Sequence, residues 1–251
     1  DKAKSFNDAV RMCFLVINNL KVLLKKAGHS INVGDEGGFA PMISDNESAL
    51  KLIVQAIKKS GFKNGKDISI CLDVAANELI KKGKYSIHSK NYISVDQSIK
   101  KYLQLIKKYK IKSIEDPFGE DDWKAWSKFV NGTKNKTQII GDDLFVTNLD
   151  RLKIGFLNLS ANSILIKLNQ IGTVTETLEV IKFAQLIGFK TIISHRSGDT
   201  EDTFIADLAV GTNSNQIKTG SLARSERIAK YNQLIRIEED LGRSAKMNKI
   251  D

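Results

Sequence analysis

Apolar positions recur at helical spacing over the first part of the chain. The period predicts a helix over residues 5–26, built on Ala9, Val10, Phe14, Ile17, Leu20 and Leu24. Asn7 and Asp8 are candidate start signals for this helix, and Gly28 is a stop signal. A glycine-rich loop follows at 33–41, and a second helix is expected from about residue 46 to residue 60.

The rest of the chain alternates short apolar runs with helical patterns. The runs are Ile68–Val74, Ile111–Glu115, Gln138–Asp142, Ser163–Leu168, Thr191–His195 and Gln216–Lys218. The helices between them are expected to begin near Val95, Asp121, Asn148, Val174, Asp202 and Ser225. This alternation is typical of parallel βα units, and apolar runs of this kind are typical of strands buried on both faces. We predict one domain over residues 1–251, with two helices followed by about six βα units.

The same pattern fits an open Rossmann-like sheet or a closed (β/α)8 barrel. The runs end in charged residues, namely Asp73, Glu115, Asp142, Lys167, His195 with Arg196, and Lys218. In a barrel the carboxyl ends of all strands converge on one mouth, whereas an open sheet spreads them along a line. Six charged ends therefore favour the barrel.

Composition agrees with a folded protein and narrows the partners. Of the 251 residues, 41% are hydrophobic and 27% are charged, with a net charge of +10. The lysines are scattered, so we read the charge as solubility with a mild attraction for anions and predict no specific nucleic-acid partner. No apolar run reaches the roughly 20 residues of a membrane span. Cys13 and Cys71 fit reduced core thiols. The first residue, Asp1, indicates a fragment or a processed product.

Three consecutive strand ends carry acids. Asp73, Glu115 and Asp142 are expected at the same level, where three like charges are unfavourable unless a cation neutralises them. An all-oxygen set suits Mg²⁺, and the alternative is that each acid caps a helix or pairs with a lysine. Asp116 and Asp143 are expected to point elsewhere, by strand alternation, and to support the site.

Basic residues end the later strands. Lys167 lies in an apolar strand, where it is either a general base or the partner of one of the acids. Lys218 is a second inward lysine, and Arg196 and Ser197 suit a phosphate. Glu36 or Asp35, in the glycine-rich loop, is expected on a mobile edge of the site. Carboxylates, a metal and a desolvated lysine imply proton abstraction next to a carboxylate.

Motifs over nearly the whole chain resemble those of enolases. They are Val-Gly-Asp-Glu-Gly-Gly-Phe-Ala-Pro at 33–41, Ser-Ile-Glu-Asp-Pro at 113–117, Gly-Asp-Asp-Leu-Phe-Val-Thr-Asn at 141–148, Ile-Lys-Leu-Asn-Gln-Ile-Gly at 166–172, Ser-His-Arg-Ser-Gly-Asp-Thr-Glu-Asp at 194–202, Gln-Ile-Lys-Thr-Gly-Ser at 216–221, and Ala-Lys-Tyr-Asn-Gln-Leu-Ile-Arg-Ile-Glu-Glu at 229–239. The resemblance implies an α/β enolase-type (β/α)8 TIM-like barrel. It also implies Mg²⁺-dependent dehydration of 2-phosphoglycerate to phosphoenolpyruvate, a carbon–oxygen lyase reaction of glycolysis.

The resemblance also implies a role for each candidate residue. Asp73, Glu115 and Asp142 would bind the catalytic Mg²⁺, and Lys167 would take the proton from C2. Glu36 would assist departure of the C3 hydroxyl as a general acid. The remaining roles fall to His195 near that hydroxyl, Arg196 and Ser197 at the phosphate, and Lys218 at the substrate carboxylate.

The resemblance further implies an N-terminally truncated chain, without the family's N-terminal domain and first two barrel strands. We expect the isolated chain to be nearly inactive, because two open sheet edges remain and the lid is missing. The full-length enzyme is expected to be a cytoplasmic homodimer, with a secondary presence at the cell surface. The alternatives are a non-catalytic binding protein, at the surface or with RNA, and another Mg²⁺-dependent acid dehydratase. The His-Arg-Ser and Lys-Thr-Gly motifs disfavour the dehydratase.

Overall fold

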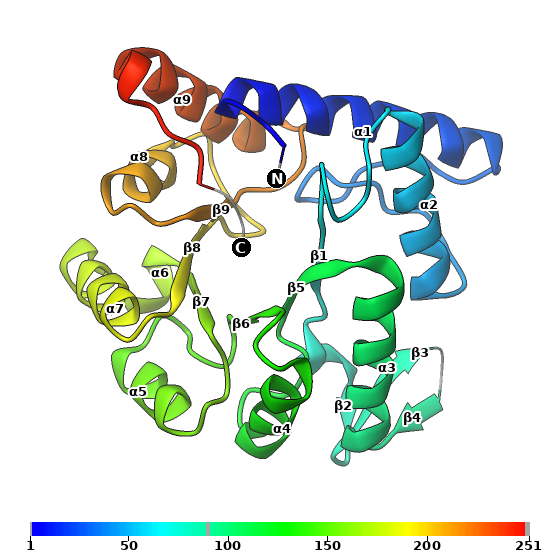
Figure 1. The fold of residues 1–251 in the computed structure, drawn as a ribbon, viewed down its shortest axis with the longest axis vertical. Coiled ribbons are helices and arrows are strands. Elements are labelled where there is room, and N and C mark those ends of the chain that lie inside the picture. Colours follow the sequence, from blue (N-terminus) through cyan, green and yellow to red (C-terminus); the bar gives the residue numbers. More distant parts are fainter. Residues whose placement is uncertain (1, 89–90, 249–251) are drawn as a thin grey trace. The chain divides into compact units, whose positions relative to one another are not determined.

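The computed structural model describes residues 2–88 and 91–248, and the chain in it forms two compact units (Figure 1). The first unit contains the described residues of 1–69, 194–213 and 217–251. The second contains those of 70–193 and 214–216. Asp1, on which the expectation of a fragment was based, lies outside the described residues. Among the described residues, no helix combines the length and apolar character that a membrane span requires.

A six-stranded sheet carries the predicted runs. Its strands are β1 (Ile70–Asp73), β5 (Ile111–Glu115), β6 (Gln138–Gly141), β7 (Ser163–Ile166), β8 (Lys190–Ser194) and β9 (Gln216–Lys218). They are ordered β1-β5-β6-β7-β8-β9, and the pairings from β1 to β8 are parallel. Every strand lies within one or two residues of a predicted run, which confirms the alternation read from the sequence.

Helices in the second unit connect the parallel strands. They are α3 (Val95–Tyr109), α4 (Trp123–Thr133), α5 (Leu149–Leu157), α6 (Leu168–Ile171) and α7 (Val174–Leu186), with a 3-10 helix, η1, at Ala76–Leu79. In Figure 1, α4, α5 and α7 lie on the same side of the strands. On β6, β7 and β8, the buried side chains of Ile140, Leu165 and Ile192 form one apolar cluster. Apolar runs thus became strands because both of their faces are covered.

A small antiparallel sheet, absent from the sequence prediction, lies between β1 and α3 in the chain. Its strands are β2 (Ile80–Lys81), β3 (Lys84–His88) and β4 (Asn91–Ile93), paired in that order. The run is rich in lysine and serine, so it lacks the apolar signal of a strand. Tyr85 anchors it, because its buried ring packs edge-on against Phe118 and its hydroxyl accepts a hydrogen bond from the Gly119 N–H.

The first unit is mainly helical. It contains α1 (Phe6–Lys26), α2 (Asn46–Lys59), α8 (Phe204–Gly211), α9 (Ser225–Leu241) and a 3-10 helix, η2, at Gly242–Ser244. The start of α1 lies against α9, because the Phe6 and Asn7 N–H groups both donate to the Glu238 carboxylate. Phe6 and Tyr231 stack with their ring centroids 6.3 Å apart.

Two local expectations were wrong. The N-cap of α1 is Ser5, whose hydroxyl accepts the Asp8 N–H, so Asn7 and Asp8 lie inside the first turn. A serine accepts this bond as well as an aspartate does, and the two signals stand side by side in the sequence. Cys13 and Cys71 are free thiols, as predicted, but both are exposed. Cys13 lies on α1, and Cys71 lies on β1, an edge strand.

Candidate functional site

The register of the second unit's sheet sets the level of its acids. Asp73 pairs with Glu115 across β1 and β5, and Glu115 pairs with Ile140 across β5 and β6. Asp142 therefore lies two residues beyond that level, just after the end of β6. Glu115 and Asp142 are buried, whereas Asp73 is exposed. The three predicted ligands lie at the ends of adjacent strands, but Asp142 is two residues further along.

The acids that come closest together are not the predicted set. In the part of the chain that the structure describes, the one cluster with ligand oxygens within 4.8 Å of one another is Asp116, Asp142 and Asp143. Asp73 and Glu115 are not members of it. Asp142 was predicted, while Asp116 and Asp143 were expected to point elsewhere, and that expectation was wrong.

The backbone at Asp116 explains the difference. Strand β5 ends at Glu115, and Asp116 has a φ of 41°, so strand alternation no longer applies to it. Its carboxylate accepts the N–H groups of Asp142 and Asp143, each at 2.9 Å. Asp116 thereby holds the first two residues after β6 in place.

The electrostatics of this cluster suit a cation. Burial and, to a smaller extent, the neighbouring Asp142 and Asp143 carboxylates together raise the pKa of Asp116 to about 8, against the lowering effect of the two N–H bonds. Like charges this close disfavour one another's ionisation, and a positive ion reverses that effect. The donor set consists of carboxylate oxygens, which a hard divalent cation such as Mg²⁺ prefers. The residues present therefore fit such an ion.

Lys167 lies directly after β7 and contacts the acid cluster. Its Nζ is 2.5 Å from Asp142 Oδ2, and the two side chains are 15% and 10% exposed. The sequence left open whether this lysine is a base or a salt-bridge partner, and here it forms the ion pair. Because the pair is largely shielded from water, neither group can lose its partner without a substantial loss of stability.

Thr147 and Gln170 complete the surroundings of Asp142 and Lys167, and the sequence analysis missed both. The Thr147 hydroxyl accepts the Lys167 N–H at 2.9 Å and donates to Gln170 Oε1 at 2.8 Å. Gln170 Nε2 in turn donates to Asp142 Oδ1 at 3.3 Å. Val146 and Thr147 have φ values of 44° and 53°, unusual for β-branched residues. The loop after β6 is thus held in a strained conformation that orients Lys167.

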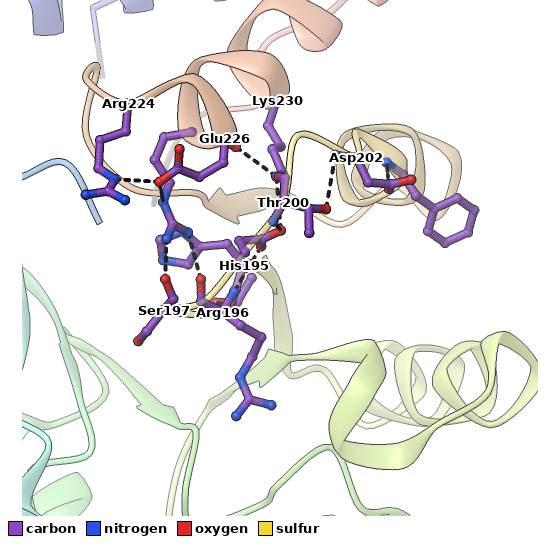
Figure 2. A network of polar contacts seen from close by, with 12 residues as sticks. His195, Arg196, Ser197, Thr200, Asp202, Arg224, Glu226 and Lys230 are labelled. Carbon is purple, nitrogen blue, oxygen red and sulfur yellow. Dashed lines mark hydrogen bonds and ion pairs between the residues drawn. The ribbon is translucent and has the colours of Figure 1, made fainter. Parts of the chain in front are cut away.

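The first unit contains a second group of predicted residues, at the end of β8. His195 is 2% exposed, and its backbone N–H donates to the Lys218 carbonyl of β9 at 2.9 Å. Arg196 and Ser197 follow it on the surface, and the Arg196 N–H donates to the Asp199 carboxylate at 3.1 Å. Figure 2 shows the Arg196 side chain extending away from α9.

Glu36 joins this group from the glycine-rich loop. Its Oε2 lies 3.6 Å from His195 Nε2, and its Oε1 accepts the Ser197 hydroxyl at 3.3 Å. Contact with His195, followed by the charge of Lys218, lowers the pKa of Glu36 to about 2. Glu36 is therefore a carboxylate near neutral pH in this structure, whereas the general acid implied by the resemblance carries a proton.

The loop that carries Glu36 is fastened, not loose. Ser221 N–H donates to the Glu36 carbonyl at 2.8 Å. Gly37 and Gly220 have φ values of 78° and 83°, and a Cβ on Gly37 would lie 2.5 Å from the Ala223 carbonyl oxygen. Glycine is needed where two backbones approach this closely. Contact with segment 220–223 sets the position of the Glu36 loop. The motif at 216–221 gave no sign of this contact.

Two buried cations of α9 support this group, and neither was predicted. Arg227 and Lys230 are 0% and 1% exposed. Lys230 donates to the Asp199 carboxylate at 3.1 Å and to the Thr200 carbonyl, and Figure 2 shows it at the turn after His195. Charged residues in a polar helix normally face solvent, so no signal in the local pattern marks these two as buried.

The known proteins that this chain matches point to one family. Residues 1–251 match the family described as enolase, C-terminal TIM barrel domain. The chain is 78% identical over 250 residues to a protein named Enolase from Pelagibacter ubique (strain HTCC1062). The match covers 100% of this chain and 60% of that relative's length. With the six-stranded parallel sheet, these matches confirm the resemblance and the fold class, an incomplete enolase-type TIM-like barrel. The chain belongs to the enolase C-terminal TIM barrel domain family.

Proposed function

We propose that this chain supplies most of the catalytic residues of an enolase, which removes water from 2-phosphoglycerate to give phosphoenolpyruvate. The observation that carries the proposal is the shielded Lys167–Asp142 ion pair beside Asp116 and Asp143. It combines a candidate base with candidate ligands for a cation, as proton abstraction next to a carboxylate requires. The printed name of the Pelagibacter relative supports the same reaction.

Asp73, Glu115 and Asp142 would hold the Mg²⁺, as the resemblance implies. Of the three clustered acids only Asp142 belongs to this set, and Asp116 would position it through its backbone. The ion, when bound, supplies positive charge that stabilises the negative charge building up on the substrate carboxylate as the C2 proton leaves. All of these acids offer carboxylate oxygens only. Soft metals, which prefer thiolate or imidazole ligands, would therefore bind them less well.

Lys167 would take the C2 proton. In the structure its ammonium is the counter-charge of Asp142, so the base function requires that Lys167 first lose its own proton to solvent and that this pair separate. Thr147 keeps the Lys167 backbone in place while the side chain changes partner, since it binds the N–H and not the amine.

The group in the first unit would act on the rest of the substrate. Arg196 and Ser197 suit the phosphate, and Lys218 suits the carboxylate. Glu36 would exchange a proton with the C3 oxygen, assisted by His195. Its lowered pKa favours the carboxylate, the form that takes a proton from water when the reaction runs in the direction of hydration.

The test compares this chain alone with a chimera that joins it to the remaining part of the Pelagibacter relative. Phosphoenolpyruvate formation is followed by absorbance in the presence of Mg²⁺ and 2-phosphoglycerate. We expect turnover by the chimera and nearly none by the chain alone. A folded chimera without turnover would contradict the proposed reaction, and near-normal turnover by the chain alone would refute the expected inactivity.

The role of Lys167 is tested in the same chimera by exchange of the C2 proton with solvent. Lys167→Ala is expected to abolish this exchange. Lys153→Ala is the matched control, because Lys153 also pairs with an aspartate, at 3.0 Å, but on the exposed face of α5. Retained exchange in Lys167→Ala would exclude this lysine as the base.

We also propose that the whole enzyme is a cytoplasmic homodimer that acts in glycolysis, as enolases do. Light scattering of the chimera tests the dimer, because a monomeric mass at working concentration would contradict it.

A further inference from the structure

Arg227 lies at the centre of the His195 group. It is part of helix α9 and was not among the predicted site residues. It is 0% exposed. Its guanidinium reaches four acceptors, of which three are backbone carbonyls: those of Arg196 at 2.7 Å, Ser197 at 2.6 Å and Asp35 at 3.0 Å. One side chain therefore joins the segment after β8 to the loop that carries Glu36.

The fourth acceptor is the imidazole of His195. Arg227 Nη1 lies 2.6 Å from His195 Nδ1. A guanidinium has five N–H donors and no acceptor, and it stays protonated in proteins. Nδ1 must therefore accept, which places the ring proton of a neutral His195 on Nε2. A proton on Nδ1 would set two donors against each other at this short distance.

The opposite nitrogen faces Glu36. His195 Nε2 is buried, and within the described residues it has no hydrogen-bond partner. It lies 3.6 Å from Glu36 Oε2, slightly too far for a direct bond. Buried donors normally have a partner, so this N–H is available for a ligand atom or for a small closing movement of Glu36.

We propose that Arg227 is a positioning residue of this site: by donating to His195 Nδ1 it keeps the His195 proton on Nε2, directed toward Glu36. Its other N–H groups fix the distance between the segment after β8 and the loop that carries Glu36. The proposal rests on the proposed function for the use of this proton, but the tautomer is a property of the chain itself. It assigns to α9 a task in the site that the strand-end motifs do not contain.

Long-range proton–nitrogen NMR of the imidazoles tests the proposal in the 251-residue chain. The chain has three histidines, and His195→Gln identifies the His195 signals by their loss. In the wild type we expect a protonated Nε2 and an unprotonated Nδ1. Arg227→Lys keeps a buried cation but loses the several N–H donors that the planar guanidinium directs to separate acceptors, and Arg227→Met removes all side-chain donors. Both variants are expected to show the two tautomers in exchange.

Lys230→Met is the matched control, since Lys230 is an equally buried cation on the same face of α9, one turn later, and its hydrogen bonds go to Asp199, Thr200 and Glu226. It is expected to reduce stability but to leave the His195 tautomer as in the wild type. A wild-type proton on Nδ1 would overturn the proposal, as would an unchanged tautomer in folded Arg227→Lys. An inactive chimera would refute the proposed reaction without altering any of these spectra.

Discussion

Gly220→Ala tests whether close backbone contact holds the Glu36 loop. A Cβ on Gly220 would lie 2.7 Å from the Glu36 carbonyl oxygen and 2.8 Å from Arg227 Cδ. Neither of these two atoms can move away easily. The Glu36 carbonyl accepts a hydrogen bond from the Ser221 N–H, and the Arg227 guanidinium is hydrogen-bonded to four acceptors. The added methyl group must therefore displace the loop or α9.

Two effects contribute to the expected loss of stability. Gly220 has a φ of 83°, and an L-residue in this region costs about 1–2 kcal/mol. Forcing an extra methyl group into a packed site costs a further ~1–3 kcal/mol. The sum is about 2–5 kcal/mol in the free energy of unfolding.

Gly61→Ala separates the two effects. Gly61 has a φ of 82°, and an added Cβ there has nothing within 4 Å. This control carries the backbone strain without the clash, so we expect it to lose about 1–2 kcal/mol. Urea unfolding of the wild type and both variants gives the comparison. Equal losses in the two variants would refute the argument that contact with the Glu36 loop makes Gly220 necessary.

Three further predictions concern the two groups of polar residues. Lys167→Met leaves Asp142 buried without its counter-charge and should lower the free energy of unfolding by about 3–5 kcal/mol; a double-mutant cycle with Asp142→Asn that shows no coupling would contradict this. Thr147→Val removes the hydroxyl bonded to the Lys167 N–H and to Gln170 and should lose about 1–3 kcal/mol in urea unfolding, whereas a neutral effect would exclude Thr147 as a support. The pKa of Glu36 is lowered from 4.5 to about 2, so the contribution of its carboxylate to the free energy of unfolding is present above pH ~4.5 and is lost as the pH falls toward 2. Because the side chain is half-exposed, this contribution is at most ~1 kcal/mol. If the difference in unfolding free energy between the wild type and Glu36→Gln does not shrink over this pH range, the prediction is refuted.

The sequence predicted the sheet well because its central strands, β5 to β8, are almost entirely buried. Strands β5 and β9 occur at the predicted residues, and α3, α7 and α9 begin where expected. The sheet at 80–93 was missed, because its strands are largely polar and their buried anchor is the ring of Tyr85. A pattern of burial predicts a strand only where burial occurs.

The candidate site divides in the same way. Residues at strand ends, such as Asp142 and His195, could be named from their position alone. Asp116 could not be placed, because its contacts depend on one positive φ value directly after β5. Arg227 could not be found, because its function depends on tertiary contacts made far from its own helix. Sequence patterns report local geometry, whereas these two roles arise from the meeting of distant segments.

The division of the chain into two units has a consequence for biosynthesis. Most of the second unit consists of residues 70–193, so nearly all of it is synthesised before α9. The first unit must wait, because the hydrogen bond from Arg227 to the Asp35 carbonyl joins residues 192 positions apart. On the ribosome, α1 and α2 therefore emerge early and can pack on each other, but the part of α1 that contacts α9 stays uncovered until α9 follows. This interval is when the nascent chain is most exposed to misassembly and most dependent on chaperones.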